Sequence, residues 1–556
     1  MLAAARCRTQ LFLLVGVIIM AGAACGEPAR LSTATFQQSA AEIAAYDFVE
    51  VTLRLGWPHP RNPFSEASLT GWFETVDGRK RWPVEGFCDA ADGSVFRVRF
   101  TPPKAGDYRF VVDYRYKADN RSFQGTFRAV ERRNKGPVRV DTLFPWHFVW
   151  EGTSEHYFFN GTTAYWLFGF RDDSVIAASL ERLARLRINR VRVTIAGRSN
   201  VLFGEPVSVG PEWTTFVTPW PAKNPDDVYH PEFDFSRFEV GYWQKIDRAL
   251  RTARERGIVI SLVLDMGMSE THPPADSDVE RRFIRYAIAR LAPFTNVTWD
   301  LGDDLNRYRD NAWAERTGKY IQQWDPYQHL TTTHLVGDKQ TVEQPRVSSW
   351  VGFTSFQNWT RNQHQFMLEQ RRKQASLGRI IPQTNEEYGY EDHYPLWAPP
   401  PDAESADVLR RMAWQIAMAG SYQSTGETAK RGTNVWPNTG GGWMNGRGDS
   451  TMTMLIGYAH ALEFFSSFEW WKADPHDELV TAGAYCLADP GRTYAVYLPH
   501  GVAAVVRLAS GQYRARAFNP LTGQWIDLAP AVGPSWVTPA APTGGEDWAI
   551  LLERDQ

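Results

Sequence analysis

Three regions of the chain differ in how hydrophobic and polar residues are distributed. Between about residues 46 and 130, short runs such as FVEVTLRL and FRVRF alternate apolar and polar positions, and turn-forming clusters such as PHPRNP and PPKAGD separate them. This alternation is typical of antiparallel strands that bury one face. The pattern predicts an Ig-like β-sandwich over residues 40–131, followed by a polar linker that ends in Gly136-Pro137.

The middle region, residues 138–468, alternates strand-like and helix-like segments. Amphipathic helical stretches such as DSVIAASLERLARLR and VERRFIRYAIARLA lie between most of eight candidate strands. The candidate strands are YFFNGTTAYW, NRVRVTI, GIVISLVLDM, NVTWDL, HLTTTH, VGFTSFQ, IIPQTNEEY and AGSYQSTG. Eight strands alternating with helices predict a (β/α)₈ TIM barrel. An open doubly wound sheet is the alternative, but no glycine-rich phosphate loop follows the first strand.

Short strands return in the last region, residues 469–556, where AYCLAD, TYAVYLP, YRARAFN and WAILLE are separated by turns such as FNPLTGQW. They predict a small C-terminal β-sandwich. The predicted fold class is therefore a multidomain mixture of α/β and all-β structure. A central TIM barrel is flanked by an Ig-like β-sandwich on its N-terminal side and by the small β-sandwich on its C-terminal side.

The N-terminal segment has the pattern of a secretory signal peptide. Arg6 and Arg8 precede the apolar run LFLLVGVIIM, which the small residues AGAAC follow up to Cys25. A membrane-spanning helix would need about 20 apolar residues, and no later segment is long and apolar enough either. The sequence predicts a signal peptide over residues 1–25 and an exported protein without a membrane span. Cys25 is a candidate for lipid modification, so the expected location is periplasmic, secreted or an outer-surface lipoprotein.

Composition narrows the class of protein further. Of the 556 residues, 22% are charged and 43% hydrophobic, which is ordinary for a globular protein and argues against disorder. The formal net charge is −3, and no basic stripe with interleaved aromatic residues predicts binding to nucleic acid. Cys88 and Cys486 lie far apart in the chain and no CxxC motif is present, so isolated buried cysteines are expected rather than a redox or zinc site.

Two acidic clusters follow predicted strands on opposite sides of the barrel. Asp303 and Asp304 follow the fourth strand, NVTWDL, and Glu386 and Glu387 end the seventh, IIPQTNEEY. Reactive residues of a (β/α)₈ barrel lie at the C-terminal ends of its strands, so these carboxylates can face one another across a substrate. Two opposed carboxyls, one protonated and one ionised, can cleave a glycosidic bond. The charge on one raises the proton affinity of the other, so both forms can coexist near neutral pH.

Each cluster also has a simpler interpretation. Asp304 could cap a helix or lie in a solvated turn, where aspartates are common. The four carboxylates could bind Ca²⁺, although the chain has no EF-hand spacing and no HExxH motif for zinc. No cofactor or metal ion is therefore expected. Side chains alternate along a strand, so only one of the two glutamates should reach the pocket, and Glu387 is favoured over Glu386.

The two clusters resemble motifs of a known family. WDLGDDLN, residues 299–306, resembles the W-x-L-G-G-D-x-N segment of apiosidase-like retaining glycoside hydrolases, and NEEYGYE, residues 385–391, resembles their N-G-E-P-x-Y-E segment. The resemblance, which with the domain order covers most of the mature chain, implies that Asp304 is the acid/base and Glu387 the nucleophile. Asp303 stands where the motif has glycine and could shape or charge the pocket. Glu386 and Tyr388 replace the glycine and proline beside the nucleophile, so substrate identity does not follow.

Further residues of the predicted barrel mouth could bind or orient a sugar. His334, Gln357 and Asn358 end the fifth and sixth strands and could hydrogen-bond sugar hydroxyls or orient the nucleophile, although they could equally be satisfied rim residues. Arg192 in the second strand could orient a carboxylate or form a structural ion pair. Tryptophan stacks well on sugar rings, and several of the 23 tryptophans lie in predicted rim loops. The remaining candidates are Trp166, Trp359, Trp397, Trp436, Trp443, Tyr390, His393 and, more weakly, Asp265.

These observations favour an exported retaining glycoside hydrolase that cleaves a plant or microbial polysaccharide or oligosaccharide. The alternative is a non-catalytic carbohydrate-binding or surface-adhesion protein on the same scaffold, which would form no covalent glycosyl-enzyme. A third hypothesis is a polysaccharide lyase, whose unsaturated product would absorb in the near ultraviolet. The sequence does not determine the sugar, the linkage, exo or endo action, or the oligomeric state.

Overall fold

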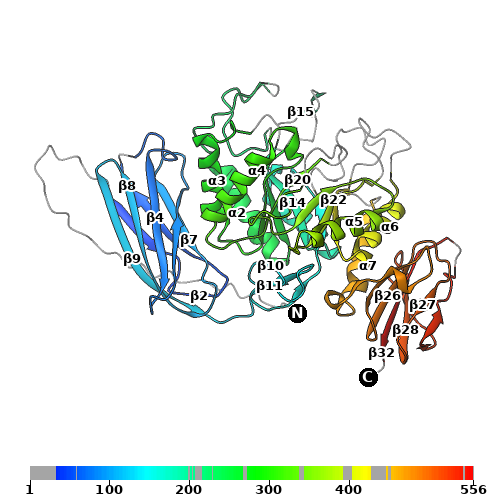
Figure 1. Cartoon of the computed structure of the whole chain (residues 1–556). Helices are drawn as coiled ribbons and strands as arrows, with labels where there is room; N and C mark the ends of the chain where they lie inside the picture. The colour runs from blue at the N-terminus through cyan, green and yellow to red at the C-terminus, as the bar shows by residue number, and fades with distance from the viewer. Residues whose placement is uncertain are drawn as a thin grey trace, which may run out of the picture. The chain divides into compact units, whose positions relative to one another are not determined.

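A computed structural model of the chain divides it into two compact units, residues 1–132 and 133–556 (Figure 1). The predicted signal peptide and Cys25 lie outside the described residues. Among those residues, no helix has both the length and the apolar character needed to cross a membrane. The structure describes residues 33–57, 59–197, 201–202, 205–206, 216–227, 230–266, 272–336, 344–391, 404–427, 446, 448, 452–542 and 545–554.

The N-terminal unit consists of two β-sheets whose strands show the predicted alternation of buried and exposed residues. Aromatic side chains join the sheets, since Phe73 stacks on Phe100 with ring centroids 4.6 Å apart and Phe96 meets Tyr114 edge to face at 5.2 Å. All strand pairs are antiparallel except the parallel pair β2 and β9. One sheet contains β1 (Ala34–Gln38), β3 (Val49–Leu55), β7 (Val95–Phe100) and β6 (Phe87–Cys88). The other contains β2 (Glu42–Ala44), β9 (Asp119–Val130), β8 (Gly106–Tyr116), β4 (Ala67–Thr75) and β5 (Arg81–Glu85).

The second unit contains the predicted barrel of parallel strands. Its strands are β13 (Asn160–Thr163), β14 (Arg190–Ala196), β17 (Val259–Asp265), β18 (Val297–Asp300), β19 (Thr331–Thr332), β20 (His334–Leu335), β21 (Thr354–Gln357), β22 (Gln383–Glu387) and β23 (Tyr422–Thr425). β19 and β20 are two pieces of the fifth strand, separated by Thr333. Thr331 pairs with Trp299 on one side and with Val351 on the other, so the sheet closes on itself. All eight predicted strand segments are present, and the predicted fold class is confirmed.

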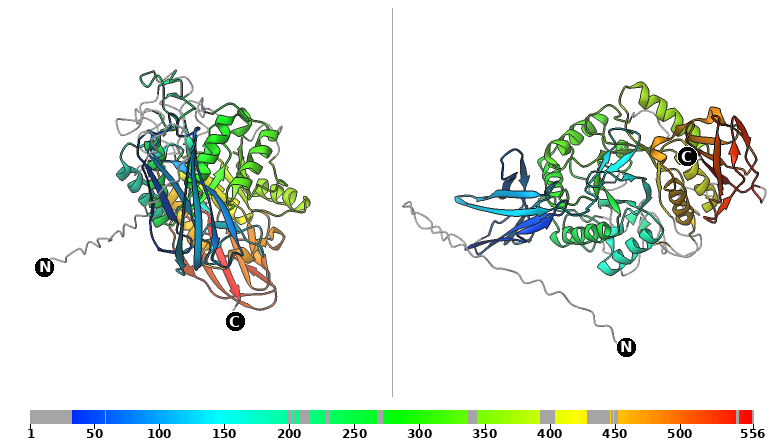
Figure 2. Two further views of the ribbon diagram at one scale, coloured as in Figure 1. Left: turned by 90° about the vertical axis from the view of Figure 1, so that its left-hand side faces the viewer. Right: turned by 90° about the horizontal axis from the view of Figure 1, so that it is seen from below.

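Helices surround the strands, as the view along the barrel shows (Figure 2). Five of them begin at a side chain that accepts a hydrogen bond from a backbone amide of the first turn, namely Asp172, Ser277, Asp310, Asn362 and Ser405. Each helix overlaps a stretch whose amphipathic pattern predicts it. They are α1 (Asp173–Arg185), α2 (Val240–Glu255), α3 (Asp278–Leu291), α4 (Asn311–Trp324), α5 (Gln363–Ser376), α6 (Ala406–Met418) and α7 (Met454–Phe465).

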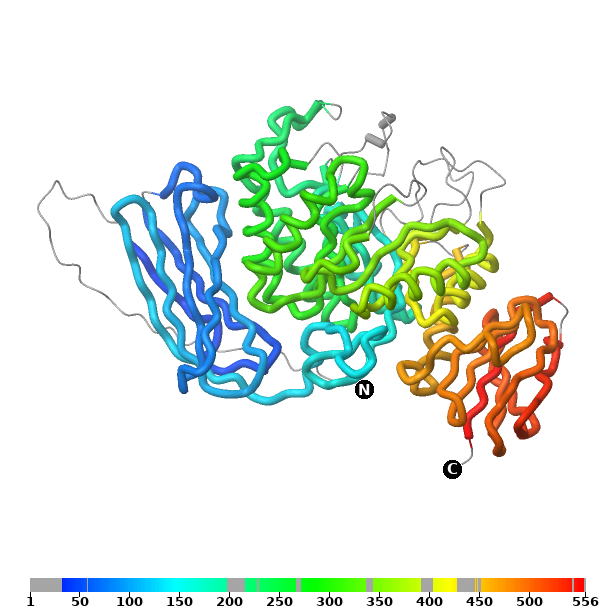
Figure 3. Tube along the Cα trace, in the orientation of Figure 1, coloured from blue at the N-terminus to red at the C-terminus, as the bar shows by residue number. Residues whose placement is uncertain are grey.

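Short elements complete the described part of this unit (Figure 3). The 3₁₀ helices are η1 (Leu167–Gly169), η2 (Leu305–Arg307), η4 (Trp470–Lys472) and η5 (Asp477–Leu479). A small antiparallel sheet joins β10 (Val138–Val140), β11 (Phe148–Trp150) and β12 (His156–Tyr157), and a hairpin joins β15 (Val201–Leu202) to β16 (Glu205–Pro206).

The C-terminal β domain packs on α6 and α7 of the barrel. Trp414 stacks on Tyr497 with centroids 5.2 Å apart, and Phe464 stacks on Trp525 at 5.6 Å, within one continuous apolar core. Cys486 is buried and free, as is Cys88 of the other unit. The strands are β24 (Asp474–Pro475), β25 (Tyr485–Asp489), β26 (Thr493–Leu498), β27 (Val505–Arg507), β28 (Gln512–Phe518), β29 (Trp525–Asp527), β30 (Ala531–Val532), β31 (Ser535–Val537) and β32 (Trp548–Arg554).

Candidate active site

Asp304 lies just beyond the C-terminal end of β18, at the first turn of η2. Its backbone is in the left-handed region, with φ 49° and ψ 38°, which aspartate tolerates better than most residues. A glycine is needed two positions earlier, because a Cβ atom at Gly302 would collide with the Tyr308 hydroxyl and with Leu305. The Asp304 side chain makes no capping hydrogen bond to η2. A simple helix-capping role therefore does not explain this residue.

The carboxyl group of Asp304 is buried and only partly paired. Its Oδ2 atom lies 2.7 Å from Arg307 Nε, and its Oδ1 atom lies 3.9 Å from His334 Nδ1 and has no hydrogen-bond partner among the described residues. Burial raises the pKa of Asp304 to about 6, and the negative charge of Asp303 adds to the rise. Asp304 can therefore hold a proton closer to neutral pH than an ordinary aspartate.

Glu387 ends β22 on the opposite side of the barrel mouth. Gln357 Nε2 donates a hydrogen bond of 2.6 Å to its Oε1 atom, and its Oε2 atom lies 4.0 Å from His334 Nε2. Burial raises the pKa of Glu387 to about 8, with the charges of Asp304 and Asp303 adding to the rise. A hydrogen bond to Glu387 also contributes to the raised pKa of Tyr390, after the larger effect of burial.

Glu386, the neighbour of Glu387 on β22, points into a different environment. Its Oε1 atom lies 3.0 Å from Arg190 Nη1 and accepts a 3.1 Å hydrogen bond from Thr384 Oγ1, and its Oε2 atom lies 2.7 Å from Arg192 Nε. Burial opposes ionisation of Glu386, but the two arginines outweigh it and lower the pKa. The alternation of side chains along the strand thus separates a buried ion pair from the carboxyl that faces His334.

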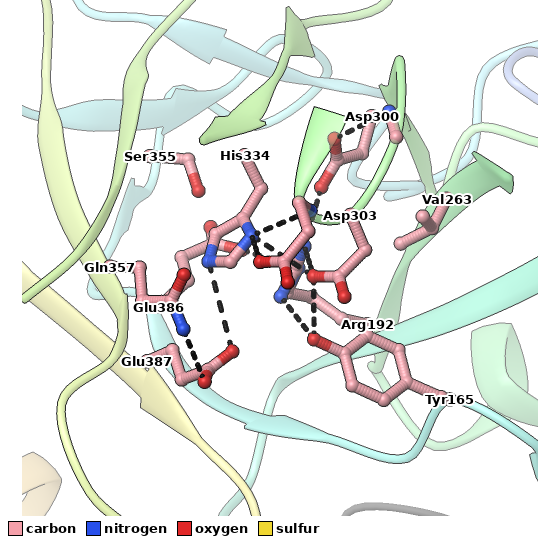
Figure 4. Close-up of polar contacts among 12 residues, drawn as sticks. Tyr165, Arg192, Val263, Asp300, Asp303, His334, Ser355, Gln357, Glu386 and Glu387 are labelled. Carbon is pink, nitrogen blue, oxygen red and sulfur yellow. Dashed lines mark hydrogen bonds and ion pairs between the residues drawn. The ribbon is translucent and has the colours of Figure 1, made fainter. Parts of the chain in front are cut away.

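Asp303 is held by three partners at a single oxygen atom. Its Oδ1 atom accepts a 2.7 Å hydrogen bond from the Tyr165 hydroxyl and lies 3.2 Å from Arg192 Nη2 and 3.0 Å from His334 Nδ1 (Figure 4). Burial opposes the charge of Asp303, but His334, Arg192 and the Tyr165 hydrogen bond lower its pKa well below the ordinary range. Asp303 is therefore held as a fixed anion.

Arg192 connects several of these groups. Besides Asp303 and Glu386, its guanidinium lies 2.9 Å from Asp300 Oδ2 and donates a 3.1 Å hydrogen bond to the Tyr165 hydroxyl. The side chain of Arg192 is fully buried. The sequence leaves two roles open for Arg192, orienting a carboxylate and forming a structural ion pair. The guanidinium nitrogen atoms do both, because they contact Asp303, Asp300 and Glu386 together.

The other predicted residues have different surroundings. Trp359 is 36% exposed and meets Tyr390 edge to face at 5.4 Å, forming an aromatic wall beside Glu387. The Asn358 side chain accepts a hydrogen bond from the Thr360 amide and so supports a turn. Asp265 ends β17, where its Oδ2 atom lies 3.5 Å from His272 Nδ1. Trp166 is buried, with 1% exposure. His393, Trp397, Trp436 and Trp443 lie outside the described residues.

The donor atoms of Asp303, Asp304 and His334 lie within 4.8 Å of one another, close enough to consider a metal ion. Two cations already neutralise these carboxylates, because Arg192 contacts Asp303 and Arg307 contacts Asp304. The donors that a divalent cation would need are therefore occupied by guanidinium groups, and the set does not fit a metal centre as arranged.

Sequence reasoning missed several residues that support the site. Tyr165 follows β13 and binds Asp303, so the rule that the ends of barrel strands carry functional groups could have found it. Arg307 lies three residues after Asp304, on the same turn of η2. Asp300 in β18 and Arg190 in β14 form buried ion pairs inside the barrel. Apart from being charged residues within buried strands, they show no sequence pattern that predicts this role.

The arrangement can perform paired acid–base chemistry. Asp304 and Glu387 are both buried, both have raised pKa values, and both contact the His334 ring. Such a pair shares one proton over a range of pH, with the other carboxyl ionised. The protonated member can donate to a leaving group while the ionised member attacks carbon.

Comparison with known families identifies two segments of the chain. Residues 205–428 match the model of the apiosidase-like catalytic domain family, and this range contains both acidic clusters. Residues 42–115 match a domain family of unknown function, DUF5060. No curated protein matches the chain. The match agrees with the resemblance of the two motifs to this family.

Solved structures share the fold. A candidate glycoside hydrolase from Bacteroides vulgatus superimposes with a TM-score of 0.75 at 19% identity, over 92% of this chain and 99% of that one. A glycoside hydrolase family 5 protein from the same organism gives a TM-score of 0.59 at 15% identity, over 76% of this chain and 94% of its own. A third glycoside hydrolase gives 0.58 at 16% identity, over 76% and 97%. The shared fold and the apiosidase-like domain support a glycosidase.

Proposed function

We propose that the protein is an exported retaining glycoside hydrolase that cleaves a plant or microbial polysaccharide or oligosaccharide by double displacement. One observation carries the proposal: Asp304 and Glu387, buried at the ends of β18 and β22, both contact the His334 ring and both have a raised pKa. The retaining route needs one carboxyl that can donate a proton and one that can attack the anomeric carbon, about 5–5.5 Å apart.

Each step has a residue in place. Asp304 donates its proton to the departing oxygen while Glu387 attacks, and Asp304 then takes a proton from the water that releases the sugar. Gln357 orients Glu387 through the 2.6 Å hydrogen bond, and Trp359 with Tyr390 offers an aromatic surface for a sugar face. In the empty site the pKa of Glu387 is raised further than that of Asp304, so the shared proton favours Glu387 there, and the sugar must bind the form in which Asp304 holds it.

The decisive experiment is a screen of the purified protein against a panel of polysaccharides and oligosaccharides. Proton NMR of the first-formed sugar should show retention of anomeric configuration, and a 2-fluoro glycosyl fluoride of the released sugar should add covalently to Glu387, as mass spectrometry would show. Binding without turnover would favour the carbohydrate-binding protein, and an unsaturated product would favour the lyase. Inversion of configuration would contradict the double displacement.

Export remains part of the proposal because its signal lies in residues 1–25. The apolar run after Arg6 and Arg8 supports it. The mass of the mature protein purified from its native host would test it, since cleavage removes the segment and lipidation at Cys25 would add acyl chains.

Arg307 should set the upper pH limit of the reaction. Its Nε atom lies 2.7 Å from Asp304 Oδ2, and its side chain is 50% exposed, so its effect on Asp304 is partly screened. The positive charge favours ionised Asp304, so Arg307→Gln should raise the pKa of Asp304 and keep the acid protonated to higher pH. We expect the basic limb of the kcat/KM profile to move up by about half a pH unit.

The control for this change is Arg307→Lys, which keeps the positive charge and should leave the basic limb in place. Measurement of kcat/KM across pH with an aryl glycoside of the identified sugar reports the free enzyme. A basic limb that stays in place or moves down in Arg307→Gln would contradict the assignment of Asp304 as the acid.

A further inference from the structure

We infer that His334, clamped by Asp303, is a positioning residue that acts through both catalytic carboxyls. As a buried imidazolium it favours the ionised form of both carboxyls, and so it opposes the burial that draws a proton onto Glu387. This inference rests on the proposed function, because it assigns His334 a part in the same reaction. Of the two roles that the sequence left open for His334, hydrogen-bonding a sugar hydroxyl and orienting the nucleophile, it favours the second.

The geometry places the two ends of one ring against the two carboxyls. Nδ1 lies 3.0 Å from Asp303 Oδ1 and 3.9 Å from Asp304 Oδ1, and Nε2 lies 4.0 Å from Glu387 Oε2 (Figure 4). The Asp304 amide lies 3.4 Å from the same Nδ1 atom. The shorter contact assigns a proton to Nδ1, donated to Asp303, because a carboxylate can only accept.

Burial excludes a direct contact with substrate. The His334 side chain has no exposed surface, and within the described part of the chain its Nε2 atom has no hydrogen-bond partner. Its backbone is held in β20, where the His334 amide donates a 3.3 Å hydrogen bond to Gly302 O. The ring therefore lies behind Asp304 and Glu387 and can affect the sugar only through them.

Carboxylates outnumber cations around the ring. The charged and titratable groups that act on it are Asp300, Asp303 and Asp304 beyond or within β18, Glu386 and Glu387 on β22, and Arg192 on β14. Burial and Arg192 oppose a charge on His334, but Asp303 and Glu387 outweigh them and raise its pKa. Arg190 and Arg192 are both paired with Glu386, and Arg192 also contacts Asp300 and Asp303. The carboxylate of Asp303 therefore serves as counter-ion to both Arg192 and the imidazolium.

Asp303 makes this clamp a feature of the present chain. The motif that residues 299–306 resemble has glycine at this position, and a glycine could neither fix the ring nor supply the charge. Tyr165 and Arg192 hold the Asp303 carboxylate in place. Asp303 in place of glycine therefore stabilises a positive charge on His334, whose ring lies between the two catalytic carboxyls.

The first test needs no substrate. With ¹⁵N-labelled histidine, and His334→Gln to assign the signal, NMR titration should give His334 a pKa above the ordinary value of about 6.5. Asp303→Asn should lower it by about one unit or more, and Glu387→Gln should lower it as well, because each removes a negative charge facing the ring. A wild-type pKa below 6.5, or one that Asp303→Asn leaves unchanged, would overturn the inference even if the protein is a glycosidase.

The second test separates this role from ordinary packing. Loss of the imidazolium should raise the proton affinity of Glu387, so in His334→Gln the acidic limb of the kcat/KM profile should move up by about one pH unit. KM should change little, because the ring does not touch the sugar. Asp303→Asn should move the same limb in the same direction and provides a second variant if His334→Gln does not fold.

His329, which lies two residues before β19, provides a matched control. Its Nδ1 atom lies 2.9 Å from Asp325 Oδ2, both side chains are 1% exposed, and the pair faces neither catalytic carboxyl. His329→Gln should lower Tm but leave the pH profile in place. Equal displacement of the acidic limb in the two histidine variants, or none in either, would reduce His334 to a structural residue. The NMR titration needs no substrate, so it tests the charge on His334 even if the protein is not a glycosidase. A failure of the proposed function can therefore be distinguished from a failure of this inference.

Discussion

Replacement of Glu387 by glutamine is expected to reduce hydrolysis by about 10⁴-fold or more while the protein remains folded. Glutamine has nearly the same shape and can still accept the hydrogen bond from Gln357, but its amide cannot attack the anomeric carbon. The measurements are kcat/KM with an aryl glycoside of the identified sugar and Tm. Azide or another external anion should restore turnover by replacing the missing nucleophile.

Glu386→Gln is the matched control. It is expected to reduce stability rather than to remove the nucleophile. The residue is the neighbour of Glu387 on β22, and its carboxylate is paired with Arg190 and Arg192. Removing one partner of a buried ion pair leaves uncompensated charge, so Glu386→Gln should cost about 3–5 kcal/mol of unfolding free energy. An active Glu387→Gln together with a stable but inactive Glu386→Gln would reverse the assignment of the nucleophile.

Removal of the Asp304 carboxyl should separate substrates by their leaving groups. For a glycoside with a poor leaving group, the loss of protonation should slow the reaction by about 10²–10⁴-fold. An activated aryl leaving group departs without protonation, so formation of its glycosyl-enzyme should be nearly unaffected. Asp304→Gly is the sharpest variant, because glycine adopts the φ of 49° freely and leaves room for an added anion.

Azide should rescue the second step of Asp304→Gly, because it attacks the glycosyl-enzyme without a general base. Asp304→Asn, which also tolerates the left-handed backbone, keeps the volume of the side chain and should be rescued poorly. Equal losses for both classes of leaving group, without rescue by azide, would return Asp304 to a structural role.

The sequence alone determined the elements and their order. The eight strand runs and the amphipathic stretches between them each correspond to an element of the barrel, because hydrophobic periodicity and helix caps act over a few neighbouring residues. Ser277 and Ser405, for example, cap α3 and α6 at the positions where the apolar pattern of each helix begins. The rule that barrel strands present functional groups at their C-terminal ends then placed Asp304 and Glu387 at one mouth.

The tertiary structure alone decided what each charged group does. Glu386 and Glu387 are adjacent in sequence, yet one is paired with two arginines almost 200 residues away and the other faces His334. Likewise, the Tyr165 hydroxyl reaches Asp303 across the barrel, and no local pattern predicts that contact. Coulomb interactions and burial depend on distance in space and on exclusion of water, so the pKa values of a site arise only when the barrel closes.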